Sequence, residues 1–239
     1  MIRKIITAFR LLFFDRDAFV KRLFTNYFGR FDIFIFYIKT KFQVYFLPQK
    51  KRLFIDLGSN VGQAYQFFRN IYPNNMYDYI LVEPNKFCVE KLNKLIDCPN
   101  VEVIEAAAWV SDGKGLLYGL HESGNNLSLG ASIIDDHKTK SYNIIKDSAL
   151  KINTFIFSDL LNEKSEIYEE IIVKMDIESS EYDILENLIK NNNINLIDRL
   201  FVEFHSKWMK ESDLKDMYKK RERKLIDTLP NYTNLHIWV

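Results

Sequence analysis

The sequence contains little that could cross-link or anchor the protein. Its 239 residues include two cysteines, Cys88 and Cys98, which form no C-x-x-C pair and have no partner histidines. This pattern excludes a disulfide framework and gives no indication of a zinc site. It is typical of half-buried thiols in a reducing cytoplasm.

Long apolar runs are also missing near the N-terminus. Charges interrupt the first segment, MIRKIITAFRLLFFDRD, before it reaches the length of a signal peptide or a membrane span. We therefore expect a cytoplasmic protein. No internal repeat or long low-complexity tract occurs, and 47% hydrophobic residues are enough for one enzyme-sized domain with a three-layer core.

The net charge of +1 conceals an uneven distribution. Residues 1–52 contain twelve Lys or Arg against three Asp, a net +9, so the remainder carries −8. The basic segment is rich in phenylalanine at helical spacing, which predicts an N-terminal extension, residues 1–50, that packs as a lid or as a face between subunits of a homo-oligomer. Contact with the inner membrane face is an alternative, and single-stranded nucleic acid is a less favoured one. Residues 51–239 then form the main domain.

The dinucleotide fingerprint G-x-G-x-x-G is absent from the first glycine turn. Residues 53–62 read LFIDLGSNVG, an apolar run followed by Gly58, Asn60 and Gly62. This predicts a buried strand that turns sharply into a helix, with small residues where a ligand approaches the backbone. Asp56 in the turn disfavours a pyrophosphate and favours a cofactor with an ammonium and a sulfonium, such as S-adenosylmethionine.

A second apolar run, residues 79–83, ends on Glu83. An acid at the end of a strand in this position is suited to accept hydrogen bonds from both hydroxyls of a ribose. Asp56 and Glu83 are 27 positions apart (83 minus 56), close to the extent of one strand–helix–strand unit of about 30 residues. The two turns together predict a nucleoside site.

The rest of the domain alternates strand and helix. After the first strand, 53–57, we expect a helix over 61–71, and after the second, 79–83, a helix to Leu95. Further strands are expected at 101–107, 171–177 and 199–204, a helix at 180–190, and a long insertion between 113 and 150 that covers a substrate. The fold class is therefore α/β, with a mostly parallel sheet and helices on both faces.

Acidic residues gather at the predicted strand ends, where ligands bind in open α/β sheets. Strand alternation predicts that Asp176 and Glu178 point to the same side, and Glu203 and His205 follow the next strand. These groups offer a general base or ligands for a divalent cation such as Mg²⁺, for which Asp176, Glu203 and His205 are the candidates. Lys174 is expected to neutralise the acids, and capping of the next helix is an alternative for Glu181.

The combined motifs resemble the FkbM family of S-adenosylmethionine-dependent methyltransferases. The family pattern, a strand with D-x-G-x-N-x-G, an acid before proline, an Ala-rich strand and K-x-D-x-E-G-x-E, corresponds here to IDLGSNVG, VEPN, IEAAAW followed by SDGKG, and KMDIESSE. The resemblance covers about residues 50–205. One departure is Ser179, which stands where the family usually has glycine.

The resemblance implies a class I methyltransferase fold. It implies that Asp56, Gly58, Asn60 and Gly62 surround the methionine part of the donor, with Glu83 on the ribose and Ala107 near the adenine. It further implies a sugar hydroxyl of a surface polysaccharide or glycoconjugate as the acceptor. The chain contains no N-P-P-Y or D-P-P-Y run, which is associated with methylation of amino groups on bases, and Trp109, Tyr118 and Trp208 are candidates to stack on sugar rings.

We therefore expect a sugar O-methyltransferase in which His205 or Asp176 removes the hydroxyl proton. Glu178 would orient the acceptor or a cation. The alternatives are an RNA methyltransferase that uses the basic N-terminal segment, a nicotinamide-dinucleotide oxidoreductase, and a catalytically idle binding domain. No nucleic-acid partner is expected under the favoured interpretation.

Overall fold

A computed structural model of the protein describes residues 38–39, 50–119, 130–137 and 149–238. The chain divides into two compact units, residues 1–48 and 49–239. The predicted N-terminal extension therefore lies almost entirely outside the described residues, and its partners stay predictions. In the described ranges, none of the helices is long and apolar enough to cross a membrane.

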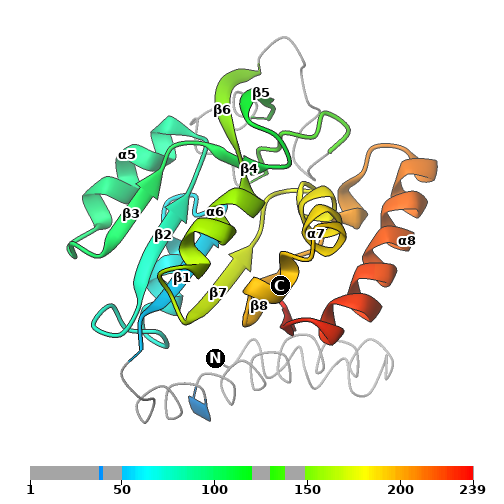
Figure 1. The fold of residues 1–239 in the computed structure, drawn as a ribbon. Coiled ribbons are helices and arrows are strands. Elements are labelled where there is room, and N and C mark those ends of the chain that lie inside the picture. Colours follow the sequence, from blue (N-terminus) through cyan, green and yellow to red (C-terminus); the bar gives the residue numbers. More distant parts are fainter. Residues whose placement is uncertain (1–37, 40–49, 120–129, 138–148, 239) are drawn as a thin grey trace, which may run out of the picture. The chain divides into compact units, whose positions relative to one another are not determined.

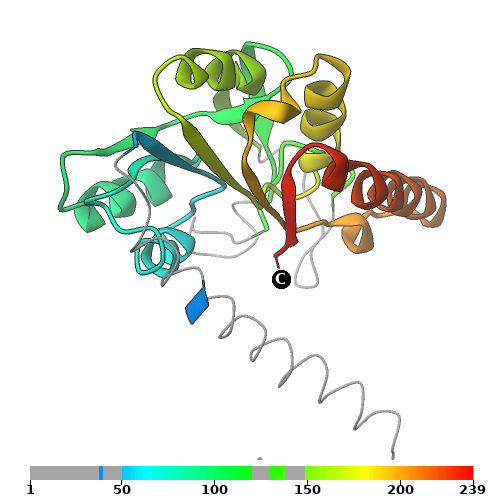
Figure 2. The same ribbon diagram turned by 60° about the horizontal axis from the view of Figure 1, so that its bottom comes forward.

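The main sheet has six strands in the order β3-β2-β1-β7-β8-β9, and every neighbouring pair is parallel (Figure 1). The strands are β1 (Arg52–Leu57), β2 (Asp78–Val82), β3 (Val101–Ile104), β7 (Glu170–Met175), β8 (Arg199–Val202) and β9 (Asn234–Ile237). Because parallel strands need crossover connections, helices cover the sheet on both faces (Figure 2). The predicted α/β fold class is confirmed.

The central strand β1 is buried at all six positions. Alternate residues point to opposite faces of a strand, so Leu53 and Ile55 enter an aliphatic core shared with β7 and α7. Phe54 points to the other face, where its ring lies 4.8 Å from that of Phe68 and 5.3 Å from that of Tyr79. Burial on both faces explains why the strand reads as a nearly continuous apolar run.

Five α-helices and three short 3₁₀ helices connect the strands in the described part of the chain. The α-helices are α4 (Gln63–Phe68), α5 (Lys86–Leu95), α6 (Phe157–Ser165), α7 (Glu181–Lys190) and α8 (Ser212–Thr228). The 3₁₀ helices are η4 (Ile194–Leu196), η5 (Ser206–Trp208) and η6 (Leu229–Asn231). The sequence patterns did not lead us to expect α6, α8 or β9.

A second sheet of three strands, in the order β4-β6-β5, corrects the prediction of one strand over residues 101–107. Its members are β4 (Ala107–Trp109), β5 (Gly113–Leu117) and β6 (Leu150–Ile156). The main-sheet strand β3 ends at Ile104, and the chain then pairs with β6 instead of β2. The predicted insertion between 113 and 150 thus contains a strand, β5, antiparallel to β6.

Two element boundaries differ from the prediction in ways that shape the site. The helix expected from residue 61 begins only at Gln63, because Asn60 and Gly62 have φ of 48° and 91°, which no α-helix allows. Strand β7 ends at Met175 and not at residue 177. Asp176 and Glu178 therefore lie in a turn after the strand, and strand alternation is not what places their side chains.

Candidate functional site

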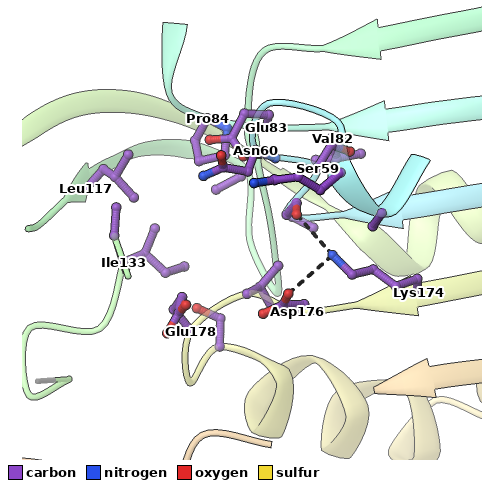
Figure 3. A pocket seen from close by; sticks show the side chains of 18 of the residues that line it. Ser59, Asn60, Val82, Glu83, Pro84, Leu117, Ile133, Lys174, Asp176 and Glu178 are labelled. Carbon is purple, nitrogen blue, oxygen red and sulfur yellow. Dashed lines mark hydrogen bonds and ion pairs between the residues drawn. The ribbon is translucent and has the colours of Figure 1, made fainter. Parts of the chain in front are cut away.

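A cavity of about 320 Å³ lies at the carboxyl ends of β1, β2 and β7. Figure 3 shows Asn60, Glu83 and Pro84 on one side of it and Asp176 and Glu178 on the other. The predicted site residues that line the cavity are Gly58, Asn60, Glu83, Ala107, Asp176 and Glu178. Those outside the lining are Asp56, Gly62, Glu203 and His205.

The turn after β1 is held against its neighbours by the backbone. The amides of Gly58 and Ser59 donate to the carbonyl oxygen of Val82 at 3.0 and 3.1 Å. Gly58 has φ of +78°, and a Cβ there would lie 1.9 Å from the carbonyl oxygen of Asp176. A side chain at Gly58 is therefore excluded, because the ends of β1 and β7 approach each other too closely.

Glu83 is placed as the sequence predicted, at the end of β2 and on the cavity wall. Its Oε2 accepts the backbone N–H of Asn60 at 2.8 Å and its Oε1 accepts that of Asn85 at 2.9 Å. A carboxylate offers about four lone-pair sites, so one on each oxygen remains for a ligand. Burial raises the pKa of Glu83 to about 7, although the two backbone hydrogen bonds favour the charged form.

Asp56 does not line the cavity, so its contact with the methionine part of a donor stays a prediction. Its side chain is fully buried beneath the turn, and Oδ1 lies 3.1 Å from Nζ of Lys174. The same Nζ lies 3.4 Å from Oδ2 of Asp176 and donates to the carbonyl oxygen of Gly58 at 3.0 Å. Lys174 thus joins the ends of β1 and β7, and it neutralises acids as predicted.

The pKa of Lys174 is raised above its ordinary value. Burial opposes the charged ammonium, but the Asp56 and Asp176 carboxylates outweigh that effect. Lys174 therefore remains charged.

Gly62 also serves packing rather than the cavity wall. It has φ of +91°, and a Cβ there would lie 2.5 Å from Cδ2 of Leu95 and 3.1 Å from Cδ2 of Leu92. Both leucines belong to α5, so the glycine allows the start of α4 to approach that helix closely. The structure thus gives a packing reason for Gly62, and its contact with a ligand stays a prediction.

His205 follows β8 and is 3% exposed. Its Nδ1 lies 3.2 Å from Oε1 of Glu181, and the same oxygen accepts the backbone N–H of His205 at 2.9 Å. Glu181 is fully buried, and α7 begins after Ser180 without a side-chain cap bond, so Glu181 contacts His205 instead of capping the helix. Burial opposes protonation of the ring, but Glu181, Glu178 and Asp176 outweigh it and raise the pKa of His205 to about 10.

Glu203, the remaining residue predicted as a metal ligand, lies at the edge of the acidic cluster around His205. Its Oε1 is 3.8 Å from Nε2 of His205 and 3.9 Å from Nζ of Lys207. Burial raises the pKa of its carboxyl. Among the described residues, one group could supply ligands to a metal ion: one atom each of Asp176, Glu178 and His205 lie within 4.8 Å of one another. This group contains Glu178, whereas the candidates expected from the sequence were Asp176, Glu203 and His205.

The sequence patterns missed His137, which lies within the predicted insertion. Its fully buried ring has Nε2 at 3.0 Å from Oε2 of Glu178 and Nδ1 at 2.8 Å from Oγ of Ser179. Ser132 in the same segment donates its hydroxyl to the carbonyl oxygen of Glu178. Residues 130–137 therefore hold the turn after β7 in place. No local motif marks His137, because its partners are about forty residues away.

Aromatic residues at the cavity also differ from the prediction. Trp109, Tyr118 and Trp208 do not line it, whereas Trp238 and Phe67 do. The two rings lie 5.4 Å apart between centroids, and the Trp238 amide donates to the carbonyl oxygen of Val202 at 2.8 Å. Trp238 is thus the tryptophan positioned to contact a ligand.

The turn after β7 explains the departure from the family pattern at Ser179. Glu178 and Ser179 have φ of 51° and 81°, in the left-handed region that glycine occupies without cost. Serine adopts this conformation here with its hydroxyl bonded to His137. The hydrogen bond offsets part of the backbone strain.

Substitutions at Ser179 should separate the effect of the hydrogen bond to His137 from the effect of the backbone strain. Ser179→Ala keeps the strain and leaves Nδ1 of His137 without its partner at 2.8 Å, so we expect a loss of about 1–3 kcal/mol in the free energy of unfolding. Ser179→Gly loses the same bond but relieves about 1–2 kcal/mol of strain, and it should be close to the wild type. Urea unfolding measures both. Equal losses for Ala and Gly would show that the left-handed backbone is not strained.

A parallel α/β sheet with a tight turn after its first strand and a buried carboxylate after its second is the arrangement expected of a nucleoside-binding fold. Residues 56–225 match the family described as the Methyltransferase FkbM domain. The chain belongs to the FkbM methyltransferase family. Membership in this family favours the methyltransferase interpretation over the nicotinamide-dinucleotide oxidoreductase.

The comparison with solved structures finds the methyltransferase FkbM from Methylobacillus flagellatus KT, which is 14% identical with a TM-score of 0.42. The similar region covers 76% of this chain and 40% of that chain. The comparison with curated proteins finds no match.

Proposed function

We propose that the protein transfers a methyl group from S-adenosylmethionine to a sugar hydroxyl of a surface polysaccharide or glycoconjugate. The observation that carries this proposal is the position of Glu83. Its buried carboxylate borders the cavity opposite the carboxylates of Asp176 and Glu178. One wall is thus equipped to hold a ribose and the other to receive a proton.

The donor side of the cavity combines polar and apolar groups. Each oxygen of Glu83 accepts one backbone N–H and has capacity for one ribose hydroxyl. Ala107, Leu117 and Ile133 add an apolar lining suited to an adenine ring. Asn60 borders the same space from the turn after β1, on the side where the methionine part of the donor would lie.

The acceptor side is acidic. A hydroxyl is a weak nucleophile until it loses its proton, and of the three predicted catalytic residues Asp176 and Glu178 reach the cavity. We assign proton removal to Asp176 and orientation of the acceptor to Glu178. His205, which does not line the cavity, positions these carboxylates from behind. Trp238 offers an aromatic face for a sugar ring.

The proposal is tested by incubating the protein with methyl-deuterated S-adenosylmethionine and a panel of simple glycosides, followed by mass spectrometry. We expect one labelled methyl group on a sugar oxygen. Asp176→Asn should abolish the product while leaving the affinity for S-adenosylhomocysteine within about threefold. Transfer to RNA but to none of the sugars would assign a different acceptor, and failure to bind S-adenosylhomocysteine would contradict the donor.

A further inference from the structure

The buried imidazole of His205 is oriented by one carboxylate and directed at three others. Nδ1 lies 3.2 Å from Glu181, whereas Nε2 faces carboxylate oxygens at 3.5, 3.6 and 3.8 Å, which belong to Glu178, Asp176 and Glu203. These distances exceed the usual range of about 2.7–3.2 Å for an N–H···O hydrogen bond. Nε2 therefore points into an acidic space without closing a short bond.

This arrangement matches the way histidine ligands are held in metal sites. A metal-binding histidine commonly donates its second ring N–H to a carboxylate, which fixes the tautomer and the ring orientation. Glu181 is placed for this role, because its Oε1 accepts the backbone N–H of His205 and lies 3.2 Å from the ring Nδ1. The orientation of His205 is an observation separate from the presence of acids nearby.

The spacing of the ligand atoms fits one ion between them. In six-coordinate geometry with metal–ligand distances of about 2.1 Å, adjacent ligand atoms lie about 3 Å apart and opposite ones about 4 Å. Nε2 of His205 lies 3.6 Å from Oδ1 of Asp176 and 3.5 Å from Oε2 of Glu178. All three ligand atoms lie within 4.8 Å of one another. A bound ion would take the place of the Nε2 proton of His205 and would share Oε2 of Glu178 with Nε2 of His137, which lies 3.0 Å away.

The local charge favours a cation as well. Four carboxylates surround the imidazole of His205, at positions 176, 178, 181 and 203. Lys174 approaches Asp176 at 3.4 Å, but it also pairs with Asp56, and Lys207 reaches Glu203 only at 3.9 Å. Two imidazoles, His205 and His137, the latter 3.0 Å from Oε2 of Glu178, and two shared ammonium groups face these four carboxylates and Asp56. The carboxylates outnumber the basic groups, and a divalent ion would offset their negative charge.

We propose that Asp176, Glu178 and His205 bind a divalent metal ion beside the cavity, with Glu181 orienting the histidine. Two carboxylates and one imidazole are a mixed oxygen and nitrogen set, which suits Mn²⁺ better than Mg²⁺. An ion at this place would lower the pKa of an acceptor hydroxyl and hold it near Asp176. That catalytic role rests on the proposed function, whereas binding of the ion does not.

Binding is tested on the full chain after treatment with a chelator, with Mn²⁺ as the probe and neither donor nor acceptor present. Calorimetry and the loss of the free Mn²⁺ signal in electron paramagnetic resonance measure stoichiometry and affinity. We expect one Mn²⁺ per chain, bound more tightly than Mg²⁺. Glu178→Gln and His205→Gln should weaken it at least about tenfold.

Glu203→Gln is the matched control, because Glu203 lies 3.8 Å from the same ring and belongs to the ligand set expected from sequence. It should change the affinity by less than about threefold. Absence of Mn²⁺ binding, or equal binding by all variants, would overturn the proposal. Thermal unfolding verifies that each variant is folded. Binding of S-adenosylhomocysteine is also measured, with the chelator present. Because no metal is then bound, this measurement distinguishes a failure of the metal site from a failure of the donor site.

Discussion

Glu83→Ala is expected to weaken binding of S-adenosylhomocysteine by about 100-fold. Two ribose hydroxyls would lose a charged acceptor, and hydrogen bonds to charged groups contribute about 1.5–3 kcal/mol each. The backbone amides of Asn60 and Asn85 would also lose their acceptor, so part of the effect is local loosening. Calorimetry measures the affinity, and thermal unfolding reports the loosening separately.

The matched control is Glu90→Ala, which removes an exposed glutamate from α5, the helix that follows β2. It should leave the affinity unchanged. Glu83→Gln is not a neutral replacement, because its amide NH₂ would face the backbone N–H of Asn60 or Asn85. If Glu83→Ala binds S-adenosylhomocysteine as the wild type does, the ribose does not lie on Glu83.

The pH dependence of binding gives a second readout of the same contact. Burial raises the pKa of Glu83 to about 7, so below this value its carboxyl is mostly protonated and is a poorer acceptor. Adenosine is the ligand for this test, because it lacks the α-amino group of S-adenosylmethionine, which titrates at about pH 8. Its affinity should rise about tenfold between about pH 6 and about pH 8 as Glu83 ionises. A flat profile would contradict a charged acceptor.

Several parts of the site could be predicted from the sequence because they depend on local pattern. The apolar runs before Gly58 and Glu83 fix two strands and their ends. In a parallel sheet neighbouring carboxyl ends meet at one edge, so proximity of Glu83 and Asp176 follows from the topology. The same reasoning predicted that His205 follows β8, although it did not predict its contact with Glu181.

The contacts that were missed depend on tertiary packing. His137 reaches Glu178 and Ser179 across about forty residues, and no periodicity marks a lone histidine in an irregular segment. The contact between Asp56 and Lys174 was also not predicted, because an acid in a glycine turn can face a ligand or a lysine of its own sheet. The register of β1 against β7 decides this, since Asp56 is directly paired with Lys174.

Lys174→Met is expected to lower the free energy of unfolding by about 3–5 kcal/mol. Asp56 is fully buried and Lys174 lies 3.1 Å from it, so the substitution leaves an uncompensated charge in the core. The carbonyl oxygen of Gly58 would lose its donor as well. Urea unfolding measures the loss, and a change below about 1 kcal/mol would show that Asp56 does not depend on this lysine.

Two further variants distinguish an unpaired charge from lost packing. Lys50→Met removes a lysine whose pair with Glu169, at 3.3 Å, is 43% and 58% exposed, and it should cost less than about 1 kcal/mol because water screens such pairs. Adding Asp56→Asn to Lys174→Met removes the buried charge and should restore more than half of the loss. If the double variant is no better than Lys174→Met, packing of the lysine side chain, and not its charge, joins β1 to β7. Restoration would instead show that an ion pair within the sheet fixes the turn after β1. Glu83 would then be the carboxylate available to a ligand on that side of the cavity.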